Sequence, residues 1–354
     1  MTVLLHLFLF LLSSSVIWGL SGLLVGATDR VAKRYRKPGF AVAFFVLGIM
    51  TSISELSVAV NAGVEGVPQV SAGNLIGGTL VIFLLIIPLL AVLGNGIPVN
   101  GSLGVKGLLS VITVAIIPSL LVLDGNVTRT EGLVMLLLYF TLLFAVQKRK
   151  PVEEMVEETV RDVEDELLHP GHWLHHKATL ADAAKILLAG MLIFVAGKIL
   201  VDESVYFSQL LSIPASLVGL LLLSIGTNAP ELVIAIRCIV GKHKDIAFGD
   251  YMGSAAANTA IMGFLAIAKG TFTLERSEFI PTFFLLLVGL ILFFIFSRTK
   301  QIFSRKEGIA LLGIYVLFIL FQLVNFIRFA GNEIKEVGTA GTSQPEVMHG
   351  SADE

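Results

Sequence analysis

The stretch TSISEL at positions 51–56, followed by GNLIG at positions 73–77, decides the fold because the chain contains it twice. The second copy is TNAPEL at 227–232, followed by GDYMG at 249–253. A constant offset of 176 positions aligns the glutamates and the glycines of the two copies. An internal repeat of this kind constrains the architecture of the whole chain. Each copy also places a carboxylate inside an apolar run, where a charge is costly and indicates function.

The composition is that of a membrane protein. The chain has 354 residues, of which 55% are hydrophobic and 15% charged, and its mean hydropathy is +0.87. A soluble domain of this composition would expose large apolar patches. The net charge of -2 gives no indication of nucleic-acid binding, and no cofactor is predicted. The only cysteine, Cys238, excludes an intramolecular disulfide framework.

The apolar runs are each long enough to cross a bilayer as a helix. They are continuous rather than alternating, which favours helices over a β-barrel. The first run has no basic segment before it and stays apolar to about residue 27, so we interpret it as a span rather than a cleaved signal peptide. Ten spans are predicted, at about 3–27, 40–62, 68–94, 105–123, 131–147, 179–200, 212–237, 245–268, 279–297 and 307–328.

Basic residues assign the two sides of the membrane. One alternating set of loops and helix ends carries 18 of the 25 Lys and Arg residues, the other set carries 6, and Lys185 lies within the sixth span. The positive-inside rule makes the richer set cytoplasmic. Both termini are then extracytoplasmic, and we expect the protein in the cell membrane.

The two copies of the repeat enter the membrane in opposite directions, because they occupy spans 2–3 and 7–8 and are therefore an odd number of spans apart. The predicted fold class is all-α, with ten transmembrane helices that form two inverted-topology five-helix repeats, a build common among secondary transporters. The predicted domains are a first half at 1–147 with its repeat at 40–94, a cytoplasmic loop at 148–178, a second half at 179–330 with its repeat at 212–268, and a disordered tail at 331–354.

The central loop contains two polar features. An acidic run from Glu153 to Glu166 is interpreted as a solvated helix, with a regulatory cation-binding surface as the alternative. Four histidines between His169 and His176 could bind a metal ion. They bracket a Pro-Gly turn beside Trp173, a residue type that suits the membrane interface, so we favour the structural interpretation.

Each copy of the repeat groups oxygen atoms around its glutamate. Thr51 and Ser52 lie four and three residues before Glu55, so on a helix they share its face, and the second copy repeats this spacing. Pro230 would clash with the carbonyl of Gly226, four residues before it, and a helix break there would free backbone oxygens. An all-oxygen set suits Ca²⁺ or Na⁺ rather than thiophilic metals.

Two carboxylates also match the charge of one divalent ion, whereas the alternative is a neutral or hydrogen-bonded pair that serves helix packing. The glycines recur four residues apart, which permits close approach of helices. The second copy is the more polar one, since Ser254 and Asn258 occupy the positions of Gly78 and Ile82. The residues expected to matter for backbone shape or packing are Gly73, Gly77, Gly226, Pro230, Gly249 and Gly253.

These motifs resemble the cation/Ca²⁺ exchanger superfamily, whose sodium/calcium exchanger membrane domain carries two alpha-repeats of the approximate pattern GTSxPEL, then GNxxGSN. The second copy departs from this pattern at Asn228, Asp250 and Ala255. The first copy departs further, with Met50 for Gly, Ser54 for Pro, and neither the Ser nor the Asn that ends the pattern. The resemblance covers almost the whole chain.

The resemblance implies a set of ion ligands. Glu55 and Glu231 correspond to the central Ca²⁺ ligands of the family. The further positions that would contribute oxygens for Ca²⁺ and Na⁺ are Thr51, Ser52, Thr227, Asn228, Ser254 and Asn258.

The predicted function is secondary active antiport of Ca²⁺ against Na⁺ by alternating access at a midplane site, with the first span of each half as a sliding gate by family analogy. With Asn228 in place of the motif serine, the second copy also resembles the proton-coupled branch of the superfamily. Antiport of Ca²⁺ or another cation against H⁺ is therefore an alternative. A transport-inactive relative is another, because the first copy is depleted. An enzyme is not predicted, since the chain has neither HExxH nor GxSxG. The oligomeric state is not predicted.

Overall fold

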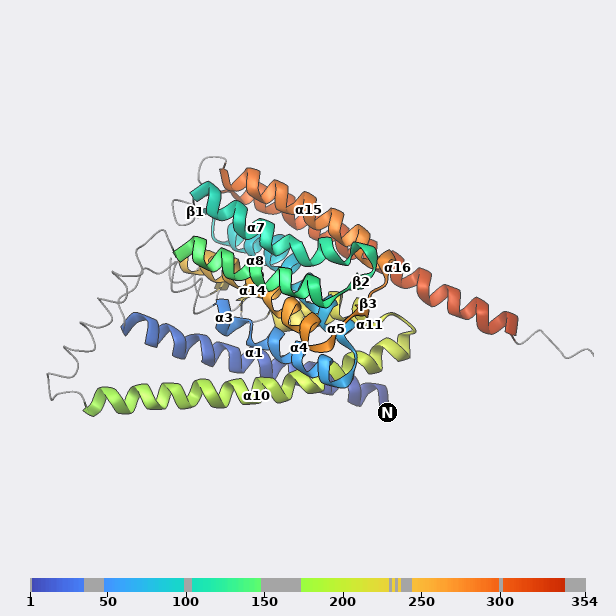
Figure 1. Ribbon diagram of the computed structural model, residues 1–354, viewed down its shortest axis with the longest axis horizontal. Helices are drawn as coiled ribbons and strands as arrows, with labels where there is room; N and C mark the ends of the chain where they lie inside the picture. The colour runs from blue at the N-terminus through green and yellow to red at the C-terminus, as the bar shows by residue number, and fades with distance from the viewer. Residues whose placement is uncertain are drawn as a thin grey trace, which may run out of the picture.

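The architecture is that of a computed structural model, which describes residues 2–34, 48–98, 104–147, 173–228, 231–232, 235–236, 244–298 and 302–340. Almost all of these residues are helical, and the long helices run roughly side by side (Figure 1). The all-α fold class predicted from the sequence is confirmed.

The described helices follow the order of the predicted spans. In the first half they are α1 Thr2–Arg34, α3 Gly48–Thr51, α4 Ile53–Glu65, α5 Pro68–Leu80, the π-helix η2 Val81–Ile86, α6 Ile87–Leu93, α7 Gly104–Leu121, the short 3₁₀-helix η3 Val122–Asp124 and α8 Arg129–Gln147. In the second half they are α10 Trp173–Leu211, α11 Ala215–Val218, the π-helix η4 Gly219–Leu223, α12 Ser224–Thr227, α14 Lys244–Lys269, α15 Arg276–Arg298 and α16 Arg305–Ala340.

Seven helices among the described residues are long and apolar enough to cross a membrane, so the chain is an integral membrane protein. These spans are Val3–Leu20, Pro68–Leu93, Gly104–Asp124, Arg129–Val146, Phe248–Lys269, Arg276–Arg298 and Arg305–Asn325. Two of them form the centre of the protein, because 83% of the apolar window of Pro68–Leu93 and 78% of that of Phe248–Lys269 are buried, against 50% or less in the other five. These two helices carry the glycine motifs.

The remaining three predicted spans have other forms. The sixth, predicted at about 179–200, lies within the 39-residue helix α10. The second is described only from Gly48 onward and the seventh consists of α11, η4 and α12 with short helical pieces after them. Both of these spans are interrupted at the repeat motif, as expected of the discontinuous helices that build transporter sites.

Two predicted boundaries differ from the structure. The described part of α10 begins at Trp173, inside the predicted loop 148–178. α16 continues to Ala340, so the start of the tail predicted as disordered is helical, and the next proline is only at Pro345. The acidic run and the histidines before Trp173 lie outside the described residues.

Two short antiparallel strand pairs join the halves. β1 Ile97–Pro98 pairs with β4 Ile302–Phe303, and β2 Asn126–Val127 pairs with β3 Phe272–Thr273. Each pair links a loop of the first half to a loop of the second half that the positive-inside rule assigns to the same side of the membrane. The pairing therefore agrees with the predicted topology.

Glycines allow the central helices to cross very closely. A Cβ atom on Gly77 of α5 would lie 2.8 Å from the Cβ of Ser224 in α12. In the other copy, a Cβ on Gly48 would lie 2.8 Å from the Cα of Gly253 in α14. The 176-residue offset aligns Gly48 with Ser224 and Gly77 with Gly253, so the two crossings are equivalent. The repeat in the sequence is thus a repeat in the packing.

α1 and α10, the first helices of the two halves, lie side by side along one edge of the molecule (Figure 1). Toward one end of this pair, the Nδ1 atom of His6 lies 2.8 Å from the Oε2 atom of Glu203. The His6 ring also stacks on Tyr206, with 3.6 Å between the ring centroids. These contacts hold α1 and α10 together as a unit.

Candidate cation site

The two acidic motifs lie at breaks in their helices. Ser52 separates α3 from α4 with φ -73° and ψ 3°, and Asn228 ends α12 with φ -83° and ψ 14°. Both residues leave the helical region of ψ near -42°. Since the offset aligns these two residues, the helix is broken at the same place in both copies, although only the second copy has a proline there.

The breaks bring the two copies into contact through matching hydrogen bonds. Thr51 Oγ1 donates to Asp250 Oδ1 at 3.2 Å, and the aligned Thr227 Oγ1 donates to Asn74 Oδ1 at 3.0 Å. Each threonine therefore reaches from the first part of one motif to the second part of the other copy. This exchange builds one site from both halves of the chain.

A third contact is not matched. Ser52 Oγ lies 3.3 Å from Ser254 Oγ. The residues equivalent to this pair are Asn228 and Gly78, and here the asparagine amide lies over the glycine. A Cβ on Gly78 would lie 2.9 Å from Asn228 Nδ2 and 3.1 Å from Asn258 Nδ2, so these amides fill the space that a first-copy serine would need. The asymmetry seen in the sequence is thus present in the packing.

The two glutamates are fully buried, each with one satisfied oxygen. Ser254 Oγ donates to Glu231 Oε1 at 2.7 Å, and Ser54 Oγ lies 2.9 Å from Glu55 Oε2. Ser54 Oγ also lies 3.1 Å from the backbone oxygen of Thr227, which is another link between the copies.

Several buried oxygens of this cluster accept no hydrogen bond. Buried polar atoms without partners are rare in proteins and call for an explanation such as a bound ion. In the described part of the chain, no basic side chain forms an ion pair with either glutamate. The unpartnered oxygens are Glu55 Oε1, Glu231 Oε2, Asp250 Oδ2, Asn228 Oδ1 and Asn258 Oδ1.

The donor set fits a hard cation. Within the described residues, no three side chains of His, Cys, Asp or Glu lie close enough to hold one metal ion together. Two glutamates from opposite copies with neutral oxygens are therefore the candidate ligands, and carboxylate, hydroxyl, amide and carbonyl oxygens are those preferred by Ca²⁺. Of the residues singled out in the sequence, Glu55, Glu231, Thr51, Ser52, Thr227, Asn228, Ser254 and Asn258 are all buried in this region.

The packing residues have distinct positions. Gly73 lies where α5 crosses α11 and η4, and a Cβ there would meet the backbone of Ser216 and Leu220. A Cβ on Gly226 would lie 3.4 Å from Ser14 Oγ of α1, an ordinary contact. Gly249 and Gly253 are buried in α14, and Pro230 lies outside the described residues.

The sequence prediction missed Ser54, Asn74 and Asp250. Ser54 directly precedes Glu55 in α4, and helical periodicity places adjacent residues on different faces, so the spacing gave no reason to expect the contact between Ser54 Oγ and Glu55 Oε2. Asn74 matches the family pattern and Asp250 departs from it, and both touch a threonine of the other copy. The offset shows which residues are equivalent but not which of them touch.

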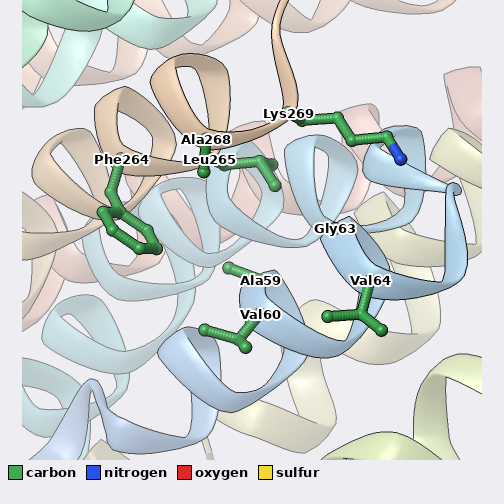
Figure 2. A pocket seen from close by; sticks show the side chains of 8 residues that line it. All are labelled: Ala59, Val60, Gly63, Val64, Phe264, Leu265, Ala268 and Lys269. Atoms are coloured by element: carbon green, nitrogen blue, oxygen red, sulfur yellow. The ribbon is translucent and has the colours of Figure 1, made fainter.

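A cavity elsewhere is separate from this cluster. It has a volume of ≈ 240 Å³ and lies between the second half of α4 and the end of α14, with Lys269 at its edge (Figure 2). Its lining is otherwise apolar and includes none of the candidate ligands, so it is not the cation site. The lining residues are Ala59, Val60, Gly63, Val64, Phe264, Leu265, Ala268 and Lys269.

Comparisons with known proteins agree with this architecture. The fold, with its long apolar helices, defines an integral membrane protein. The sequence model of the family described as "Sodium/calcium exchanger protein" matches residues 5–147 and 183–324, so the chain belongs to this family. It is a membrane cation antiporter by family, with inorganic cations as substrates.

Individual relatives are more distant. The sodium/calcium exchanger MaX1 of Methanosarcina acetivorans is 31% identical over 140 residues, which cover 39% of this chain and 40% of that protein. The inner membrane protein YrbG of Escherichia coli is 25% identical over 247 residues, or 68% of this chain and 72% of that protein. A structure of the sodium-calcium exchanger NCX_Mj superposes with a TM-score of 0.64 at 20% identity and covers 89% of this chain and 98% of that one, which shows that the fold is shared.

Proposed function

We propose that this protein exchanges Ca²⁺ for Na⁺ across the cell membrane by alternating access at the site formed by Glu55 and Glu231. The observation that carries the proposal is the pair of buried glutamates from opposite copies, each with an oxygen that accepts no hydrogen bond. The sodium/calcium exchangers MaX1 and NCX_Mj among the similar proteins support the choice of ions.

The charge of the site explains exchange. Two carboxylates at the membrane centre are strongly unfavourable without compensation. One Ca²⁺ or two Na⁺ neutralise the pair, so Ca²⁺ and Na⁺ compete for the same oxygens. An empty carrier keeps the uncompensated charges and crosses slowly, which couples the movement of one ion to the return of the other.

The unit formed by α1 and α10 is the proposed sliding gate. It meets α4 through a polar contact within the membrane, where Ser57 Oγ donates to Phe194 O at 3.1 Å and Asn61 Nδ2 donates to the same oxygen at 3.2 Å. Gly197 lets the two helices approach closely, since a Cβ there would overlap the Ser57 side chain. Hydrogen bonds to one backbone oxygen can be exchanged for others as α10 slides past α4.

The topology is part of the proposal. Both termini are placed outside the cell by the distribution of basic residues, and the acidic and histidine-containing loop is placed in the cytoplasm. The strand pairs β1–β4 and β2–β3 support the alternation of the loops, because each joins loops of the same predicted side, while the orientation itself rests on the basic residues.

The test is ⁴⁵Ca²⁺ uptake into proteoliposomes under an imposed Na⁺ gradient at constant pH. The wild-type chain is expected to accumulate Ca²⁺, and Glu55→Gln and Glu231→Gln are each expected to abolish uptake. Glu278→Gln is the matched control, because Glu278 is an equally buried carboxylate that bonds Ser216 outside the site. Uptake that survives both site substitutions would overturn the proposed site.

A second candidate function is exchange of Ca²⁺ against H⁺. It is favoured by the amides of Asn228 and Asn258, which fill the space over Gly78 and leave the first copy without the hydroxyl that the second copy has. Uptake driven by a pH gradient in the absence of Na⁺ would support this candidate. Ca²⁺ binding with no flux under either gradient would instead identify a transport-inactive relative.

A further inference from the structure

Asp250 stands at a position where the first copy has a neutral residue. The offset aligns Asp250 with Asn74, and both side chains accept a hydrogen bond from the threonine of the opposite copy. Asn74 shows that an amide oxygen is sufficient for this contact. The second carboxylate oxygen of Asp250 is therefore not needed for packing, and its negative charge is the property that distinguishes the two positions.

The side chain of Asp250 belongs to the polar face of α14. Asp250, Ser254 and Asn258 follow one another at intervals of four residues and so share one side of the helix. Ser254 donates to Glu231 at 2.7 Å, which shows that this side is turned toward the site. Asp250 is 0% exposed, and its Oδ2 atom has no hydrogen-bond partner.

We propose that Asp250 is a third carboxylate of the cation site, which selects divalent over monovalent cations by its charge. This inference rests on the proposed function. A buried carboxylate needs a compensating charge, and no basic side chain of the described residues forms an ion pair with Asp250. Asp250 thus adds a third negative charge to the two that the transported cation neutralises, and the bound cation attracts it.

The geometry makes Asp250 a neighbour of the bound ion rather than a ligand shared with both glutamates. No three acidic side chains of the described chain are close enough to hold one ion together. Without direct coordination, the interaction between the Asp250 carboxylate and the ion is Coulombic, and its energy is proportional to the charge of the ion. A divalent ion therefore gains twice the free energy that a monovalent ion gains at the same place.

This proportionality gives a numerical signature. Removal of the Asp250 charge should weaken Ca²⁺ binding by the square of the factor by which it weakens the binding of one Na⁺. A threefold loss for Na⁺ corresponds to about a tenfold loss for Ca²⁺. A residue with only a structural role would change the two affinities by similar factors.

The experiment measures equilibrium binding of ⁴⁵Ca²⁺ and ²²Na⁺ to the purified full-length protein. Asp250→Asn keeps the acceptor for Thr51 and removes the charge, so we expect about tenfold weaker Ca²⁺ binding and about threefold weaker Na⁺ binding. Asn74→Asp adds a charge at the equivalent position and should strengthen Ca²⁺ binding more than Na⁺ binding. The double variant should recover the wild-type ratio of affinities.

The possible outcomes distinguish a failure of the Asp250 proposal from a failure of the proposed exchange function. Suppose that the wild-type protein binds both ions. If Asp250→Asn then leaves both affinities unchanged, or weakens them by the same factor, the role of Asp250 is wrong and the proposed function stands. The variant Asn74→Asp decides the same question if Asp250→Asn does not fold. Wild-type protein that binds no Ca²⁺, or Glu55→Gln that binds it normally, would overturn the proposed function itself.

Discussion

Gly73→Ala should loosen the helix crossing that forms the site. An alanine Cβ at this position would lie 2.9 Å from Leu220 N and from Ser216 C, and closer still to Ser216 O. Contacts between a methyl carbon and backbone atoms are ordinarily about 3.3–4 Å, and the overlap with Ser216 O is the largest, so the helices must separate by more than about 1 Å. These atoms are backbone and cannot move aside as a flexible side chain would.

The expected loss is about 1–3 kcal/mol of stability, the usual range for an overpacked core. The higher helix propensity of alanine offsets up to about 1 kcal/mol in any helix. Gly313→Ala in α16 is the matched control, because a Cβ at Gly313 has no atom within 4 Å and gains only the propensity. The variant and its control should therefore differ by about the full 1–3 kcal/mol.

The separation should also disturb ion binding. Asn74 follows Gly73 directly and accepts the 3.0 Å hydrogen bond from Thr227, so a shift of α5 alters this link between the copies. We expect ⁴⁵Ca²⁺ uptake in proteoliposomes to fall at least about tenfold, in line with the effect of ångström-scale misplacement at functional sites. Thermal unfolding followed by size-exclusion chromatography measures the stability. If Gly73→Ala and Gly313→Ala melt at the same temperature, the close crossing does not exist.

Four further substitutions test the asymmetry of the site and the α1–α10 unit. Asn258→Ala should weaken Ca²⁺ binding about tenfold, because a site that needs six to eight oxygens loses an amide oxygen with no hydrogen-bond partner, as measured by ⁴⁵Ca²⁺ binding. Ser52→Ala should have a smaller effect, since its hydroxyl already donates to a backbone oxygen at 2.7 Å; the reverse order would contradict an asymmetric site. Ile82→Asn, which places an amide where the first copy has none, should change the Na⁺ dependence of uptake without abolishing Ca²⁺ transport, and an unchanged Na⁺ response would show that the amide does not reach the ion. Glu203→Leu should lower the melting temperature, because it removes the 2.8 Å contact between the carboxylate and His6 Nδ1 that joins α10 to α1; an unchanged melting temperature would show that this contact adds nothing to stability.

The sequence was sufficient to predict the fold class and the meeting of the two acidic motifs. Both predictions depend on the 176-residue offset and on apolar runs of the right length, which are properties that can be counted along a chain. The helix break at Asn228 was predictable, because Pro230 follows it in the sequence, but the equivalent break at Ser52 was not, because no proline follows Ser52. Its conformation follows from contacts with the other half of the chain.

The detailed contacts of the site were not predictable for a related reason. Thr51 and Asp250 are 199 residues apart, and nothing in the local sequence of either residue indicates that they meet. The same holds for Ser54 and the backbone of Thr227. Such pairs are set by how closely α5 and α14 cross their neighbours, which depends on glycines whose partners become known only in three dimensions.

Differences between the two copies bear on the energetics of transport. With two identical inverted copies, the inward-open and outward-open states would be related by exchange of the copies and would have equal energies. In this chain the two copies are not identical, because the positions of Ser254 and Asp250 in the second copy are occupied by Gly78 and Asn74 in the first. The polar groups are therefore concentrated on α14, and the two open states present different ligands to the ion. The backbone breaks and helix crossings follow the symmetry of the repeat, whereas the ion chemistry follows the residues that depart from it.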